Sequence, residues 1–188
     1  MKFKIFNVRI ELSFLCVAAL TIVLLIDKSG KTALCMLGAF VHECGHILAL
    51  VLCRVNIRSI TFRAFDIVIS TGREKNFLTD LYVTLSGPFS NLIFALLFYH
   101  VYYPFFVCNM VLCLFNLLPL ETFDGGHALK LLLSRFFTYK TVNLVLLVLT
   151  LMFLVPMLVF GILLLFYSKY NYTLLLIALY LLAILFIK

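Results

Sequence analysis

Residues 31–53 read KTALCMLGAFVHECGHILALVLC, an apolar run long enough to cross a lipid bilayer as a helix. His42, Glu43 and His46 stand in the middle of this run. Ionisable side chains inside lipid are costly unless they are paired, so they mark a functional site by default. The stretch therefore predicts both a membrane-spanning helix and the place where the chemistry of the protein lies.

The composition of the whole chain supports a membrane protein. Of its 188 residues, 65% are apolar and only 12% are charged, and the mean hydropathy is +1.18. A soluble domain of this length has too much surface for its volume to bury so much apolar area. We therefore expect an all-α polytopic membrane protein whose apolar helices face lipid.

Six apolar runs are close to the length that crosses about 30 Å of hydrocarbon. They cover residues 10–26, 31–53, 80–101, 104–120, 141–167 and 170–187. The first resembles a signal peptide, but no small-residue cleavage site follows it, so we interpret it as a permanent span. We expect a single membrane domain over residues 1–188, with about six helices around a three-helix catalytic core at about residues 31–130.

The loop between the second and third spans has a different pattern. Apolar and polar residues alternate with a period of two over residues 60–64, and Ile67 and Ile69 then alternate with Val68 and Ser70. This alternation is typical of strands and predicts a short β-hairpin within the 54–80 loop. Such a hairpin could pair with an unwound substrate, because cleavage requires an extended backbone. A solvated basic loop is the alternative interpretation.

Lysine and arginine are unevenly distributed between the two sides of the predicted spans. With a cytoplasmic N-terminus, the inner segments hold 12 of these 15 residues, and the outer segments hold Lys28, Lys31 and Lys169. The positive-inside rule then predicts that both termini are cytoplasmic. Membrane insertion and attraction to anionic lipid headgroups account for the net charge of +7. We therefore expect no nucleic-acid partner.

All six cysteines lie within the predicted spans. None of them forms a C-x-x-C pair, and the predicted outer loops contain none. We therefore expect free thiols that pack as small buried apolar side chains.

The spacing of the two histidines points to metal binding. His42 and His46 are four residues apart, so on a helix they project from one face and can bind the same ion. Glu43 can accept a proton from a water molecule that the metal makes more acidic. Gly45 would let another backbone or a substrate come close. The alternative is that neighbouring helices satisfy these polar groups, but their place inside a span favours a metal site.

A catalytic zinc site needs a third protein ligand. Residues 115–129 read FNLLPLETFDGGHAL, where Pro119 would end the fourth helix and two glycines would permit a tight bend. We favour Asp124 as the third ligand, with Glu121 and His127 as competitors. Asp124 could instead cap the N-terminus of a helix over residues 125–137, a role that is compatible with metal binding.

Two asparagines also lie within apolar spans, where an amide must find hydrogen-bond partners. Asn91 is in the third span and Asn116 is in the fourth. Hydrogen bonding between helices is one role for them, and a catalytic role is the other, because an amide donor can stabilise a developing oxyanion. His100, at the predicted outer end of the third span, is interpreted as interfacial.

Three motifs together resemble the site-2 protease family of intramembrane zinc metalloproteases. That family carries H-E-x-x-H, then G-P-x-x-N, then N-x-x-P-x-x-x-x-D-G on successive spans. The chain has HECGH at residues 42–46, GPFSN at residues 87–91, and the third motif from Asn116 to Gly125. All three occur in order within about residues 38–130.

The resemblance implies a role for each matching residue. His42, His46 and Asp124 would bind zinc, and Glu43 would be the general base. Asn116 would hold the substrate or stabilise the oxyanion, and Asn91 would lie near the site. The chain departs from the family at His127, where an arginine is common.

The resemblance also implies an activity, which is hydrolysis of a peptide bond in or near a transmembrane segment of a membrane-tethered substrate. A precursor of a transcription or sigma factor is one such substrate, and a regulatory membrane partner is compatible with this activity. Because 188 residues leave no room for PDZ or CBS domains, the layout is most similar to the sporulation-linked branch typified by stage IV sporulation protein FB. That branch implies a bacterial plasma membrane and a site reached from the cytoplasm.

Two other functions are alternatives to this one. A metal transporter needs further ligands along a pathway, and a prenyl-protein protease needs a glutamate on a later helix. The last two predicted spans contain no Asp, Glu or His, which argues against both.

Overall fold

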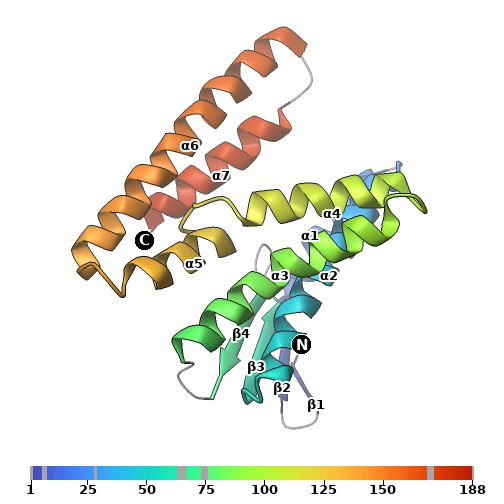
Figure 1. Ribbon diagram of the computed structural model, residues 1–188. Helices are drawn as coiled ribbons and strands as arrows, with labels where there is room; N and C mark the ends of the chain where they lie inside the picture. The colour runs from blue at the N-terminus through green and yellow to red at the C-terminus, as the bar shows by residue number, and fades with distance from the viewer. Residues whose placement is uncertain are drawn as a thin grey trace. The chain divides into compact units, whose positions relative to one another are not determined.

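A computed structural model describes residues 2–5, 8–27, 29–62, 67–72, 76–168 and 172–187. It forms two compact units, Met1–Asn116 and Leu117–Lys188. The fold is mostly helical, as the composition predicts, and the elements follow the chain in the order drawn in Figure 1. That residues 1–188 form a single membrane domain remains a prediction.

The helices of the first unit are α1 (Phe14–Ile26), α2 (Lys31–Leu52), α3 (Phe77–Phe98) and α4 (Tyr103–Asn116). Helix α3 packs against both α2 and α4, and α2 also packs against α4 (Figure 1). Buried small residues lie at these contacts, Gly38 and Gly45 on α2 and Gly87 and Ala95 on α3. Small side chains let helix backbones approach closely where lipid offers no hydrophobic driving force between helices.

Asp27 directly follows α1 and precedes α2. The carboxylate of Asp27 accepts the backbone N–H of Ser29 at 2.7 Å and that of Thr32 at 2.6 Å, so it occupies two donors at the start of the helix. Hydrogen bonds from the side chain of Ser29, followed by those from Thr32, hold the pKa of the Asp27 carboxyl well below its usual range. A negative charge at a helix N-terminus is also favoured by the helix dipole.

The first unit also contains a four-stranded sheet in the order β1-β2-β3-β4, formed by β1 (Lys2–Ile5), β2 (Val8–Leu12), β3 (Ile57–Phe62) and β4 (Ile67–Thr71). The pairs β1–β2 and β3–β4 are antiparallel, and β2–β3 is parallel. The β3–β4 pair confirms the predicted hairpin, although residues 63–66 lie outside the described part of the chain. A parallel pair needs a crossover connection, which α1 and α2 provide.

The sheet is anchored to the ends of two helices. Ile57 of β3 and Ile69 of β4 pack against a buried cluster of Ala49, Leu50 and Val83. Ala49 and Leu50 are in the last turn of α2, and Val83 is in the second turn of α3. These contacts hold the C-terminal half of α2 and the N-terminal half of α3 in one arrangement.

The second unit contains α5 (Asp124–Leu133), α6 (Tyr139–Ser168) and α7 (Thr173–Ile187). Helices α6 and α7 run side by side (Figure 1), and α5 packs against α6. The core of the unit is formed by Leu120, Leu154, Ala178 and Leu181.

Each predicted span contains a helix, but the prediction of six full spans is supported only in part. Among the described residues, α2, α3 and α6 are long and apolar enough to cross a membrane by length and composition. The helices α1, α4 and α7 have only 13, 14 and 15 residues. Residues 170 and 171 of the predicted sixth span lie outside the described residues.

Two boundaries of the six predicted spans differ from the observed helices by four residues, and the others differ by three or fewer. The first span was predicted from residue 10, but β2 continues to Leu12 and α1 begins at Phe14. The period-two alternation of residues 8–12 is the signal that predicts this strand. The fourth span was predicted to residue 120, but α4 ends at Asn116, because the ring of Pro119 disfavours helical backbone before it.

The cysteines whose side chains are described are free, namely Cys35, Cys44, Cys53, Cys108 and Cys113. The expectation of free thiols therefore holds for this set. The expectation that they are buried is wrong for Cys35 and Cys44, which are exposed on the surface of α2. In a spanning helix such a surface faces lipid, so an apolar residue there need not be covered by protein.

Candidate metal centre

The two histidines of the HECGH motif converge on one point. Their Nε2 atoms lie 3.1 Å apart, and the rings meet edge to face with centroids 4.8 Å apart. Two nitrogens bound to one zinc ion, each at roughly 2.0–2.1 Å and at a tetrahedral angle, would lie about 3.3 Å from each other. The spacing of His42 and His46 on α2 therefore fits two ligands of a single ion.

A carbonyl of α3 orients the ring of His46. The Nδ1 atom of His46 lies 2.8 Å from the carbonyl oxygen of Val83. A carbonyl can only accept, so Nδ1 carries the proton and the lone pair of His46 is on Nε2. A backbone partner of this kind is the usual way in which a metal-binding histidine is held in its ligating tautomer.

Glycines bring α3 against the imidazoles. A Cβ atom at Gly87 would overlap His46 Nε2 and would lie 2.8 Å from His42 Cε1. A Cβ atom at Gly45 would lie 2.6 Å from the backbone oxygen of Ser86. The close approach expected at Gly45 is therefore present, and it is the backbone of α3 that approaches.

The two asparagines occupy different surroundings. Asn91 is completely buried, and its Nδ2 atom lies 3.4 Å from His42 Nδ1. Asn116 is the last residue of α4, half-buried, and its Nδ2 donates to the carbonyl oxygen of Leu112 at 3.0 Å. The first amide thus contacts a predicted ligand directly, whereas the described bond of the second lies within its own helix.

Glu43 is half-buried on α2. It follows His42 in the helix, so its side chain leaves the axis at about 100° from that of the histidine. At the far end of α3, His100 is exposed and packs its ring against Tyr99, which agrees with the interfacial position expected for it.

In the second unit, Asp124 is the first residue of α5, and its Oδ2 atom is buried. The N-cap position of α5 is Phe123, with no capping bond from its side chain, so the predicted N-cap role of Asp124 is wrong by one residue. An aspartate in the first turn of a helix is still favoured by the helix dipole.

The two glycines after Asp124 have a different role from the expected bend. Among the described residues, Gly30 is the glycine with positive φ, so Gly125 and Gly126 have ordinary backbone angles within α5. A Cβ atom at Gly125 would overlap the carbonyl oxygen of Leu117, and one at Gly126 would overlap that of Leu120. The glycines therefore allow the preceding segment to pack closely against the first turn of α5.

The two competing third ligands have other surroundings. Glu121 forms an ion pair with Lys130 at 3.6 Å. His127 is exposed on α5.

Comparisons with known proteins bear on this arrangement. Residues 98–158 match the sequence profile of Peptidase family M50. The matched segment contains Asn116 and Asp124 but neither histidine. A comparison with curated protein sequences found no match.

A comparison with solved structures found the site-2 protease from Methanocaldococcus jannaschii. The two chains superpose with a TM-score of 0.69 and 22% sequence identity, over 96% of this chain and 91% of the archaeal one. The protein therefore has the fold of that intramembrane protease.

Proposed function

We propose that the protein is an intramembrane metalloprotease of the site-2 protease type. The observation that carries the proposal is the convergence of His42 and His46 on one point, within an apolar helix long enough to span a membrane. The match to Peptidase family M50 and the fold of a site-2 protease support the same function.

In this proposal His42, His46 and Asp124 hold a zinc ion. Two imidazoles and a carboxylate are a common ligand set of catalytic zinc, and the order of the three motifs along the chain supports Asp124 as the third member. Bound zinc would supply a Lewis acid that polarises a peptide carbonyl and lowers the pKa of water. Neutral imidazoles that bind through Nε2 are also suitable ligands for zinc.

Glu43 is the general base in this mechanism. Its carboxylate accepts a proton from the attacking water and returns it to the amine that leaves. Its half-buried position beside His42 supports this role. A base of this kind contributes about 10²–10⁴-fold to the rate.

Asn116 binds the substrate or donates to the developing oxyanion. The thiols of Cys35 and Cys108 are in contact and Gly38 faces Leu112, so α4 advances along α2 in the same direction. Asn116 is one turn beyond Leu112, toward the part of α2 that carries the histidines. An amide has two N–H donors, and Leu112 takes one of them, so the second serves the substrate in this proposal.

The substrate is a membrane-tethered protein whose transmembrane segment must unwind to be cut. Strand β4 is at the edge of the sheet, where its backbone supports pairing with an extended segment. From the family resemblance we propose the precursor of a transcription or sigma factor, cut in sporulation under the control of a membrane partner. A bacterial plasma membrane is the corresponding location.

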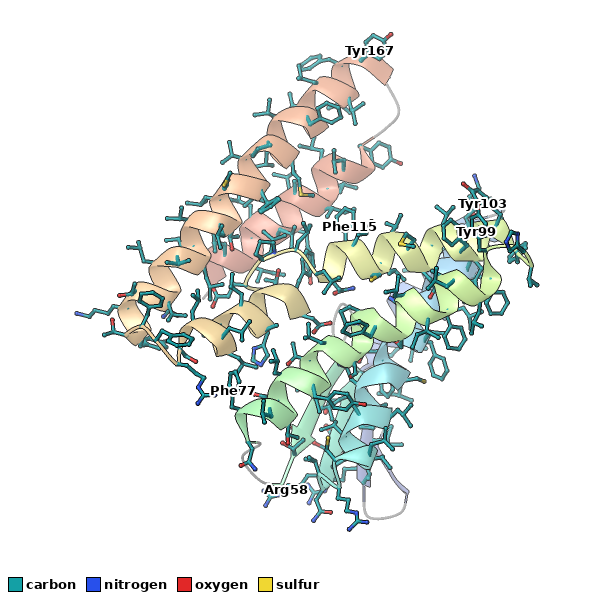
Figure 2. The ribbon with its side chains drawn as sticks, in the orientation of Figure 1. Arg58, Phe77, Tyr99, Tyr103, Phe115 and Tyr167 are labelled. Carbon is teal, nitrogen blue, oxygen red and sulfur yellow. The ribbon has the colours of Figure 1, made fainter. Side chains whose placement is uncertain are left out.

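The charge distribution supports access from the cytoplasm with both termini inside. Figure 2 shows Arg58 at one end of the first unit and Tyr99 and Tyr103 at the other. Arginines are enriched on the cytoplasmic side and tyrosines at membrane interfaces. His46 is six residues before the end of α2 on the arginine side, which is about 9 Å along the helix axis.

Replacement of the general base tests the proposed activity. We expect Glu43→Gln to lower cleavage of a tagged single-span reporter in proteoliposomes by about 100-fold or more, while one zinc per chain is retained. Cys44→Ser, at the next position on the exposed surface of α2, is the matched control and should keep both. Cleavage by Glu43→Gln at the wild-type rate would contradict the proposal.

Replacement of the third ligand tests the metal site separately. We expect Asp124→Ala to lower zinc occupancy, measured by atomic absorption on purified protein, because three ligands become two. Glu121→Ala should leave the occupancy unchanged. If Asp124→Ala kept its zinc, Glu121 or His127 would be the better ligand.

A further inference from the structure

The amide of Asn91 makes an incomplete set of hydrogen bonds. The side chain is completely buried between helices, and its Nδ2 atom faces His42 Nδ1 at 3.4 Å. Its Oδ1 atom is buried and has no hydrogen-bond partner in the described part of the chain. A buried amide oxygen without a partner is uncommon and needs a physical reason.

The hydrogen bonds around the histidines form a relay with a defined direction. The Asn91 amide donates to His42 Nδ1, so His42 carries its proton on Nε2. That proton points to His46 Nε2 at 3.1 Å, and His46 donates from Nδ1 to the carbonyl of Val83. Each ring nitrogen has a partner in this arrangement, but His42 Nε2 has no lone pair for a metal.

Ligation through His42 Nε2 requires the other tautomer. The single proton of the neutral ring must then be on Nδ1, which becomes a donor and needs an acceptor. A half-turn of the Asn91 amide about its last bond would bring Oδ1, the atom without a partner, against Nδ1. The ring has one N–H in both states, so no proton is gained or lost by the imidazole.

We propose that Asn91 is a positioning residue that serves both tautomers of His42, as a donor to Nδ1 without metal and as an acceptor from Nδ1–H with metal. This proposal rests on the metal site proposed above but not on proteolysis. An amide is the side chain that offers a donor and an acceptor at one position. A carboxylate offers an acceptor alone, and an aliphatic side chain offers neither.

Asn109 of α4 provides a matched control. It is also completely buried, and its Oδ1 also lacks a partner in the described part of the chain. Its Nδ2 donates to the carbonyl oxygen of Phe105 at 2.9 Å, within its own helix. Loss of this amide therefore perturbs the packing of the helices without removing a partner of His42.

The first experiment compares zinc affinity of the wild type, Asn91→Leu, Asn91→Asp and Asn109→Leu in detergent, by competition with a chelator. Loss of a partner that orients a metal-binding histidine typically costs 10–100-fold, so we expect about that loss for Asn91→Leu. Asn91→Asp restores an acceptor and should bind zinc within about tenfold of the wild type. Asn109→Leu should bind zinc as the wild type does.

The second experiment reads the tautomer of His42 directly, from ¹⁵N chemical shifts of protein labelled at histidine. We expect the proton on Nε2 in zinc-free wild type and on Nδ1 in zinc-loaded protein. In Asn91→Asp the proton should be on Nδ1 even without zinc, because the carboxylate can only accept. This variant is nearly isosteric, so it provides a test even if Asn91→Leu fails to fold.

The outcomes separate this proposal from the proposed function. If the wild type binds no zinc, the metal site fails and this proposal fails with it. If the wild type binds zinc but Asn91→Leu binds it equally well, or loses no more affinity than Asn109→Leu, the role of Asn91 alone is overturned. The same conclusion follows if His42 has one tautomer with and without zinc.

Discussion

Two pairs of packed helices, α2–α3 and α6–α7, use a glycine in different ways. At Gly87 a Cβ atom would overlap the histidine rings, and the contact contains the buried Asn91. At Gly161 a Cβ atom would lie 3.0 Å from the backbone of Leu175, and the buried core residues of the same two helices are Leu154, Ala178 and Leu181. The same small residue thus makes room for histidine side chains in one pair and for a neighbouring backbone in the other. A similar substitution should therefore have very different effects.

The largest effect is expected for Gly87→Ala. The added methyl group takes the place of the imidazoles, so the rings must turn away from the point on which they converge. Displacement of reacting groups by about 1 Å can cost about 100-fold in rate, and we expect at least that loss of cleavage together with loss of zinc.

Zinc content and reporter cleavage measure this effect, and circular dichroism controls for helix content. Retention of zinc and activity by Gly87→Ala would remove the distinction between the two helix pairs.

A smaller effect is expected for Gly161→Ala. The new Cβ requires α7 to move by a few tenths of an ångström, which opposes a gain of about 0.8–1.0 kcal/mol in helix propensity. The two terms nearly cancel, so thermal unfolding should shift by no more than a few degrees and zinc affinity should not change. A loss of zinc comparable to that of Gly87→Ala would show that the second pair also positions ligands.

The smallest effect is expected for Asp27→Asn, at the start of α2 and away from its contact with the histidines. The depressed pKa of Asp27 means that its carboxylate stabilises the fold at pH values above the ordinary carboxyl range, and that this contribution is lost as the pH falls below that range. The melting temperature of Asp27→Asn should therefore be slightly lower than that of the wild type at neutral pH.

This difference should narrow as the pH is lowered, while zinc affinity stays the same. Melting curves of both proteins at several pH values measure it. A difference that is constant over the acidic range would exclude the carboxylate as its source.

Much of the fold could be predicted because its signals are local. Apolar runs of helix length indicated where helices form, and the pattern of residues 60–70 indicated a strand or hairpin. The strand β2 was not predicted, because residues 10–12 fall within the first apolar run. Its partner β3 is about 50 residues away, and a pairing of that separation leaves no mark in either segment alone.

The role of the glycines after Asp124 shows the limit of such signals. A pair of glycines is equally consistent with a bend and with a close contact. The carbonyl oxygens of Leu117 and Leu120 lie against these glycines, so the pair serves a close contact and not a bend. The sequence shows where a glycine leaves space beside the backbone. Which neighbouring group occupies that space is decided by tertiary packing.

The amino-acid sequence by itself determined that His42 and His46 share one face of an apolar helix, because four residues are about one helical turn. Only the tertiary structure decided how the rings are oriented. The partners of His46 and His42 are Val83 and Asn91, which are 37 and 49 residues away on another helix. Their contact depends on the close approach of α3 at Gly87, and so the tautomers follow from helix packing rather than from the motif.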